Sequence, residues 1–210
     1  MLNRLQYISQ GVSSHEQIDN IRHALDAGCQ WIQLRFKNTS EEVLQTTAAQ
    51  VKRHCEQYAA TFILNDDPKL AMEVDADGVH LGLTDMPIEQ ARNIIGSHKI
   101  IGGTANTLQD VFKRAHEKCD YVGVGPYRFT STKEKLSPIL GLSGYQAIMH
   151  SMQVHDIQMP VYAIGGILAD DLEELMRCGV YGIAVSGMIT KHQNKLELIQ
   201  LLNQRLYATT

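Results

Sequence analysis

Short apolar runs and longer amphipathic segments alternate along the whole chain. The apolar runs are rich in Ile, Val, Leu and Tyr, and Gly, Pro or Asp stand at their ends, which is typical of β-strands. The pattern predicts strands over residues 5–9, 31–37, 61–65, 78–82, 99–105, 121–126, 160–166 and 182–187. Several of these runs are almost continuously apolar, as in parallel strands that are covered on both faces.

Each apolar run is followed by a segment whose apolar residues recur at the spacing of an amphipathic helix. The predicted helices cover residues 13–28, 40–58, 67–74, 86–96, 107–118, 143–152, 169–179 and 195–207. In the first helix we expect Ser14 as the N-cap, with Gln17 three residues later and Gly28 as the stop. In the third, Asp67 is the expected cap and Pro68 takes the first helical position.

Eight alternations of strand and helix predict an α/β fold of the closed (β/α)8 type, a TIM barrel, as a single domain over residues 1–210. A weak internal repeat supports this prediction, because similar turns lead into every second strand ("DAGCQWIQL", "EVDADGVHL", "HEKCDYVGV", "MRCGVYGIA"). An open doubly wound sheet is the alternative. Its first strand-to-helix turn would usually carry GxGxxG, whereas the turn here is "SQGVSSHE".

Composition narrows the class of protein. With 19 basic and 23 acidic residues, the chain does not favour nucleic acid or an anionic membrane as a partner. No apolar run approaches the roughly 20 residues that span a bilayer, and the first residues lack the apolar region of a signal peptide. The four cysteines are far apart, without CxxC, and the nine histidines lack the close spacing of a zinc site. We therefore expect a cytoplasmic protein with reduced, mostly buried thiols.

Polar residues collect where the predicted strands end, which is where a (β/α)8 barrel places its catalytic groups. These positions carry Gln33, Arg35, Lys37, Asn65, Asp66, Asp85, Thr104, Asn106, Thr130, Thr132, Lys133, Gly165, Gly166, Ser186 and Gly187. Each has an ordinary structural explanation: a carboxylate can cap the helix that follows, a polar loop can simply be solvated, and two glycines can form a tight turn. His80, within the fourth strand, is expected to be a packed histidine.

Taken together, the set predicts two sites for anionic ligands. Asp66 and Asp85, from adjacent loops, could share a hard divalent cation, and Mg²⁺ fits because it commonly takes one or two carboxylates. Arg35, Lys37 and Lys133 around that cation would neutralise a polyanion such as pyrophosphate. The glycine-rich ends of the last two strands match the usual phosphate site of such barrels.

The chain resembles the thiamin-phosphate synthase family, within the superfamily that also holds the thiazole tautomerase TenI. The stretches that carry the resemblance are "IQLRFK", "ILNDDPKLA", "ADGVHLG", "DYVGVGPYRFTSTK" and "YAIGGI". The family consists of transferases that join an aminopyrimidine, carried as its pyrophosphate ester, to a thiazole phosphate. The resemblance therefore implies small-molecule substrates and leaves the oligomeric state open, including a homo-oligomer.

The resemblance also implies a role for each residue of the site. Residues expected to line the pyrimidine pyrophosphate are Gln33, Leu34, Arg35, Phe36, Lys37, Asn65, Thr104 and Lys133. Those expected at the thiazole phosphate are Thr130, Ser131, Thr132, Gly166, Ser186 and Gly187, while Asp66 and Asp85 would bind Mg²⁺. The sequence departs from the family at Phe36 (commonly Glu), Thr104 (Ser), Asn106 (often His) and Phe129 (Pro), and Ser186 stands one place early.

The implied reaction needs no side-chain nucleophile. Arg35, Lys37 and Lys133 would act as catalytic residues that stabilise the departing pyrophosphate with Mg²⁺, leaving a pyrimidine-methyl cation for the thiazole nitrogen to capture. One alternative is the tautomerase, whose branch typically lacks the two acids. Others are a non-catalytic barrel that binds thiamin precursors and a phosphate-binding barrel isomerase, which would want an acid/base pair.

Overall fold

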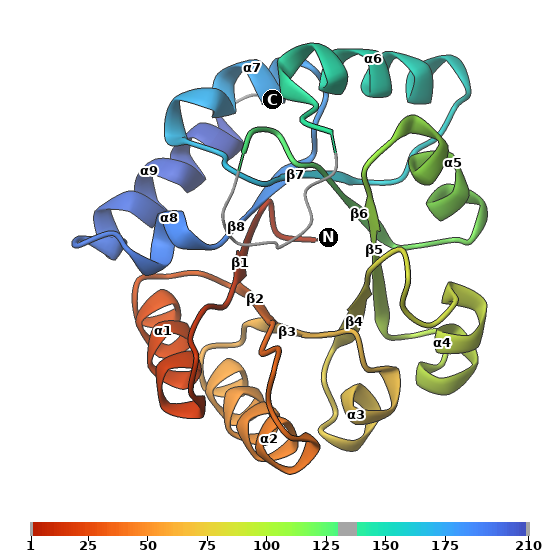
Figure 1. The fold of residues 1–210 in the computed structure, drawn as a ribbon. Coiled ribbons are helices and arrows are strands. Elements are labelled where there is room, and N and C mark those ends of the chain that lie inside the picture. Colours follow the sequence, from red (N-terminus) through yellow and green to blue (C-terminus); the bar gives the residue numbers. More distant parts are fainter. Residues whose placement is uncertain (1, 130–137, 209–210) are drawn as a thin grey trace.

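The computed structural model describes residues 2–129 and 138–208, and these form a closed barrel of eight parallel strands inside a ring of helices (Figure 1). The strands are β1 (Leu5–Ile8), β2 (Trp31–Leu34), β3 (Thr61–Asn65), β4 (Gly78–Leu81), β5 (Ile100–Ala105), β6 (Tyr121–Val124), β7 (Val161–Ile164) and β8 (Gly182–Val185). The helices are α1 (Ser14–Asp26), α2 (Glu41–Gln57), α3 (Pro68–Glu73), α4 (Ile88–Ile95), α5 (Leu108–His116), α6 (Gly141–Val154), α7 (Leu172–Arg177), α8 (Gly187–Thr190) and α9 (Lys195–Tyr207). The predicted TIM barrel is confirmed.

The barrel closes where β1 pairs with β8, with Leu5 opposite Ile183. The strand order around the barrel follows the chain, so neighbouring strands in sequence are hydrogen-bonded in space. All eight carboxyl ends therefore meet at one mouth, as the sequence pattern predicts.

Most element boundaries differ from the sequence prediction by a few residues, and three of these differences bear on the site. The second strand ends at Leu34, so residues 35–37 belong to the loop that follows it. The last strand ends at Val185, and the residues after it form the short helix α8, which the apolar pattern does not reveal. The predicted helix over 169–179 begins as a 3₁₀ turn, Ala169–Asp171, before α7.

Alternation along the strands builds two layers of core. Side chains that point into the barrel include Trp31, Tyr121 and Tyr162, whose rings meet edge to face with centroids 5.0–5.3 Å apart. Gly102 leaves the space for Tyr121, because a Cβ there would lie 2.1 Å from the tyrosine ring. Leu34 and the other residues that alternate with the inward-pointing ones along the strands point outward and pack against the helices. The interior is thus filled below the mouth.

Local capping explains where several helices begin. Asp67 caps α3, accepting hydrogen bonds from the N–H groups of Lys69 and Leu70 at 2.9 and 3.0 Å, as predicted. The prediction for α1 is wrong by one residue. Ser13 is the cap, with extended backbone, while the Ser14 hydroxyl contacts Thr47 of α2.

Three further features bear on the expectations from composition. Cys29, Cys55 and Cys119 are buried and Cys178 is half-buried, and all four are free. Burial raises the pKa of the Cys29 thiol to about 11, which keeps it protonated at neutral pH. In the part of the chain that the structure describes, no helix has both the length and the apolar character needed to cross a membrane.

Candidate active site

A cavity of about 600 Å³ opens at the carboxyl ends of the strands. Sequence-predicted residues that line it are Arg35, Thr104, Asn106, Gly165, Gly166, Ser186 and Gly187. Residues that the sequence did not single out for the site, and that line it too, include Gln10, His80 and Lys191. Thr130, Ser131, Thr132 and Lys133 lie outside the described residues, so their predicted roles stay predictions.

Asp66 and Asp85 meet beside this cavity. Asp66 follows β3 directly, in a left-handed conformation (φ 71°) that Asp tolerates better than most residues, and its other neighbour is Lys37 at 3.0 Å. Burial raises the pKa of Asp85, and its hydrogen bond with Asp66 raises it further. Burial also opposes ionisation of Asp66, but the hydrogen bond from Asp85 and the ion pair with Lys37 outweigh it, so its pKa is lowered. The two carboxyls therefore interact directly, and their pKa values are shifted in opposite directions.

The loop between β4 and α4 holds Asp85 in place. Its carboxylate accepts a hydrogen bond from the N–H of Gly82 at 2.6 Å, whereas the N-cap of α4 is Pro87, with no side-chain cap hydrogen bond. The suggestion that Asp85 caps α4 is therefore wrong. The Gly82 carbonyl in turn accepts a hydrogen bond from Arg114, a buried guanidinium on α5, at 2.8 Å. A cation under the loop thus supports the acid that the loop carries.

The end of β2 separates side chains that face the barrel interior from side chains that face the helices. Gln33 donates to the Asn65 side chain at 2.6 Å, and Arg35 lines the cavity. Leu34 and Phe36 are buried in the outer core, at 0% and 8% exposure. Any contact of these two with a substrate would therefore come from the backbone.

A chain of hydrogen bonds runs through the barrel interior to the cavity. The Gln6 amide donates to the Tyr121 hydroxyl at 3.1 Å, and Tyr121 pairs with His80 Nδ1 at 3.0 Å. The other ring nitrogen, His80 Nε2, lies 3.0 Å from the Thr104 hydroxyl. His80 is thus a buried, packed histidine, as predicted, and it also orients a residue of the cavity wall.

The loop after β7 brings backbone close to the cavity. Gly165 and Gly166 both have positive φ (91° and 70°), which favours glycine, and a Cβ on Gly166 would lie 2.5 Å from Arg128 Cγ. The Arg128 guanidinium donates to the Gly166 carbonyl at 2.8 Å and forms a two-pronged ion pair with Asp171. Glycine at position 166 thus makes room for the Arg128 side chain, and the ion pair holds that side chain against the loop.

The segment after β8 completes that side of the cavity. Ser186 donates its hydroxyl to the Ile8 carbonyl at 2.6 Å, so in this rotamer the side chain is used within the protein. Gly187 begins α8, and a short extra helix after strand 8 is a frequent part of phosphate sites in such barrels. The arrangement suits an anion held mainly by backbone groups.

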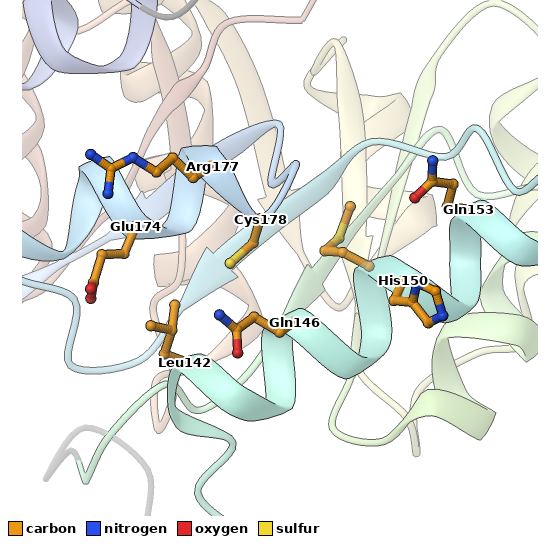
Figure 2. A pocket seen from close by; sticks show the side chains of 8 residues that line it. Leu142, Gln146, His150, Gln153, Glu174, Arg177 and Cys178 are labelled. Atoms are coloured by element: carbon orange, nitrogen blue, oxygen red, sulfur yellow. The ribbon is translucent and has the colours of Figure 1, made fainter.

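A second hollow, of about 330 Å³, lies on the outside of the barrel between α6 and α7 (Figure 2). Gln146 and Cys178 lie between the two helices there, with Glu174 and Arg177 on α7. Burial and the nearby Glu174 carboxylate raise the pKa of the Cys178 thiol, so it is a poor nucleophile. The residues that line this hollow come from α6, α7 and Cys178 and not from the carboxyl ends of the strands, so the candidate active site is the cavity at the barrel mouth.

An acid pair with neighbouring cations on one side of a barrel mouth, facing glycine-rich loops on the other, defines a class of protein. It is the class of (β/α)8-barrel enzymes that act on phosphorylated small molecules. Comparison with known proteins narrows this class to one family.

The sequence matches the family described as thiamine monophosphate synthase over residues 6–189. It is 55% identical over 206 residues to a thiamine-phosphate synthase of Flavobacterium psychrophilum, covering 98% of this chain and 100% of that one. A second relative with the same name, from Flavobacterium johnsoniae, is 56% identical over 208 residues, with 99% and 98% covered. Among solved structures, thiamine phosphate pyrophosphorylase from Pyrococcus furiosus superimposes with a TM-score of 0.84 at 30% identity, covering 98% of this chain and 96% of that one.

The chain belongs to the thiamine monophosphate synthase family. The predicted resemblance is therefore confirmed, and so is the prediction of an enzyme of the transferase type.

Proposed function

We propose that the protein condenses an aminopyrimidine pyrophosphate with a thiazole phosphate, giving thiamine phosphate and pyrophosphate. The observation that carries the proposal is the contact of Asp66 with Asp85 beside Lys37, across the barrel from Gly165 and Gly166. An acid pair next to a cation suits a metal-bound pyrophosphate, and glycine-rich loops after strands 7 and 8 suit a phosphate. The two sides of the barrel mouth would thus each hold the anionic group of one substrate.

The metal in this proposal is Mg²⁺, and Asp66 and Asp85 would hold it. Residues 2–129 and 138–208 contain no group of three or more His, Cys, Asp or Glu that could hold a metal. Two carboxylates fit Mg²⁺, which completes its shell with water and phosphate oxygens. The raised pKa of Asp85 beside Asp66 supports the assignment, because a cation between the two carboxylates would relieve their repulsion. When bound, the ion would neutralise charge on the leaving pyrophosphate.

The bond changes require positioning and charge rather than acid–base chemistry. The C–O bond between the pyrimidine methylene and pyrophosphate breaks with both electrons going to oxygen, and the thiazole nitrogen supplies the pair for the new C–N bond. No proton has to move. We assign the developing negative charge to Arg35, which lines the cavity, and to Lys37, which pairs with Asp66, and Lys133 keeps the same predicted role.

We assign Gln33 and Thr104 to the pyrimidine ring. Gln33 is 2% exposed, and its Oε1 has no hydrogen-bond partner among the described residues. A buried acceptor left in that state costs about 1–3 kcal/mol. The amino group of the pyrimidine would supply the missing donor, and the Thr104 hydroxyl, held by His80, could bond a ring nitrogen.

The alternatives are less well supported. A thiazole tautomerase would need neither the acid pair nor the cation beside it, so Asp66 and Asp85 favour the synthase. A non-catalytic binding barrel would show binding without turnover. We also propose a cytoplasmic location, supported by the buried free thiols, while a homo-oligomer remains a prediction.

The test is formation of thiamine phosphate from the two substrates with Mg²⁺ or with EDTA. We expect product in the assay with Mg²⁺ and none in the assay with EDTA. Asp66→Asn should lower kcat/KM at least about 100-fold, because it removes one metal-binding charge without a change of shape. Asp67→Asn is the matched control. Asn caps a helix as well as Asp, so its activity should stay within about threefold of wild type.

Two results would contradict the proposal. Full Mg²⁺-dependent activity in Asp66→Asn would remove the metal assignment. Absence of product from folded wild-type protein under both conditions would remove the synthase assignment.

A further inference from the structure

Among residues 2–129 and 138–208, the cavity is lined by cations and by no acid. Among the described residues that line it, Arg35 and Lys191 carry formal positive charge and none is Asp or Glu. The strand order β7-β8-β1-β2 separates the two cations. Arg35, after β2, lies on the side of the acid pair, whereas Lys191, after β8, lies on the side of the β7 glycines. Each side of the cavity therefore has a cation of its own.

The Lys191 side chain lies close to Gly187 at the edge of the cavity. Its Cε lies 4.0 Å from the position that a Cβ on Gly187 would occupy, and the Gln10 side-chain nitrogen lies 3.8 Å from the same position. Lys191 takes part in none of the salt bridges recorded within residues 2–129 and 138–208. Its ammonium is thus available to a ligand at the position where Gly187 leaves space.

Arg128, a second cation near the β7 glycines, already has partners within the protein. Its guanidinium forms an ion pair with Asp171 and donates a hydrogen bond to the Gly166 carbonyl. A phosphate monoester carries about 1.5 to 2 negative charges at pH 7, which backbone N–H groups alone would not neutralise. Lys191 is the described cavity-lining cation on this side that can supply the opposite charge.

We infer that Lys191 binds the phosphate of the thiazole substrate, donating from its ammonium where the absence of a side chain at Gly187 leaves space. This inference rests on the proposed function and assigns a residue to its second substrate. It makes Lys191 a determinant of substrate choice, because it distinguishes a thiazole phosphate from the corresponding thiazole alcohol.

The experiment compares Lys191→Met with Lys195→Met, which removes the same charge four residues further on, where the side chain bonds the His192 carbonyl outside the cavity lining. Both variants and wild type are assayed with thiazole phosphate and with the thiazole alcohol. A hydrogen-bonded ion pair of this kind contributes a factor of about 10–100 in affinity. We expect Lys191→Met to raise KM for the thiazole phosphate by that factor and to leave KM for the pyrimidine pyrophosphate unchanged. Lys191→Arg should restore part of the loss.

The thiazole alcohol decides the outcome. If Lys191→Met weakens alcohol and phosphate equally, or leaves the phosphate KM at the wild-type value, the inference is wrong. Lys195→Met should match wild type with both. If the wild-type protein makes no thiamine phosphate, the proposed function fails separately. Calorimetric binding of thiazole phosphate to wild type and Lys191→Met then tests the residue by itself.

Discussion

Replacing Arg114 by Met tests how the barrel supports the loop that carries Asp85. The Arg114 side chain is 3% exposed and makes three hydrogen bonds: to the Gly82 carbonyl at 2.8 Å, the Thr104 carbonyl at 3.1 Å and the Glu117 carboxylate at 2.9 Å. Gly82 also holds Asp85 through its N–H. One guanidinium therefore joins the ends of β4 and β5 beneath the acid pair.

The size of the effect follows from these contacts. Met keeps much of the length of Arg114 but donates no hydrogen bond, so two carbonyls and Glu117 lose a charged partner. Breaking a buried pair by removing one side typically costs about 3–5 kcal/mol. Glu117 is 22% exposed and recovers part of its solvation, so we expect a loss of about 3–4 kcal/mol in the free energy of unfolding. For a chain of this size that lowers Tm by roughly 6–16 °C.

Arg92→Met is the control, because Arg92 also bonds loop groups but at the amino-terminal end of the barrel. Its guanidinium donates to Asp120 at 2.7 Å and to the Gly96 carbonyl at 3.0 Å. Thermal unfolding of both variants is measured with and without Mg²⁺ and pyrophosphate. Both should be less stable than wild type, but only Arg114→Met should lose the additional stabilisation by the ligands. Stability of Arg114→Met within about 1 kcal/mol of wild type, or equal loss of ligand stabilisation in both variants, would refute the reasoning.

Two further predictions concern the loop after β7. Gly166→Ala and Gly28→Ala both place Ala at positive φ, at a cost of about 1–2 kcal/mol in stability. The new Cβ at position 166 would lie 2.5 Å from Arg128 Cγ, whereas the new Cβ at position 28 would have no neighbouring atom within 4 Å. Only Gly166→Ala should therefore raise KM for the thiazole phosphate, and equal KM values in the two variants would count against the phosphate site. Burial opposes ionisation of Asp171, but hydrogen bonds from Arg128 and the Leu168 N–H outweigh it and lower its pKa. Its stabilisation is then complete above about pH 4 and is lost as the pH falls through the lowered pKa. Asp171→Asn should cost about 1–2 kcal/mol in urea unfolding at neutral pH and progressively less in acid, and a pH-independent difference would exclude the ionised pair as the cause.

Local sequence was enough where the relevant contacts lie within one turn or one strand. Asp67 and Pro68 start α3 as predicted because an N-cap and the residue after it need no distant partner. The Ser13–Ser14 doublet shows the limit of such reasoning. Either serine could cap α1, and the choice follows the packing of α1 on α2, where Ser14 bonds Thr47 at 2.7 Å.

The candidate site was predictable to the extent that strand ends are predictable. Arg35, Thr104 and the glycines reach the cavity because their strands were located to within a few residues, although β2, β7 and β8 end before Arg35, Gly165 and Gly187. Arg114 was missed, although it left a signal: it shares the buried face of α5 with Val111, three residues earlier, and a charge on such a face needs a partner. Lys191 left no comparable signal, since it follows a four-residue helix that the apolar pattern does not reveal.

The sequence by itself determined the alternation of strands and helices, the parallel sheet and the family, because periodicity, caps and short motifs are properties of neighbouring residues. Only the tertiary structure decided which distant residues meet: Gln10, after β1, with Gly187, after β8, and Arg114 of α5 with the Gly82 carbonyl. Those contacts depend on the register of all eight strands and on the closure of β1 against β8. Closure is a property of the whole chain, so no single segment encodes the distance between two groups across the mouth.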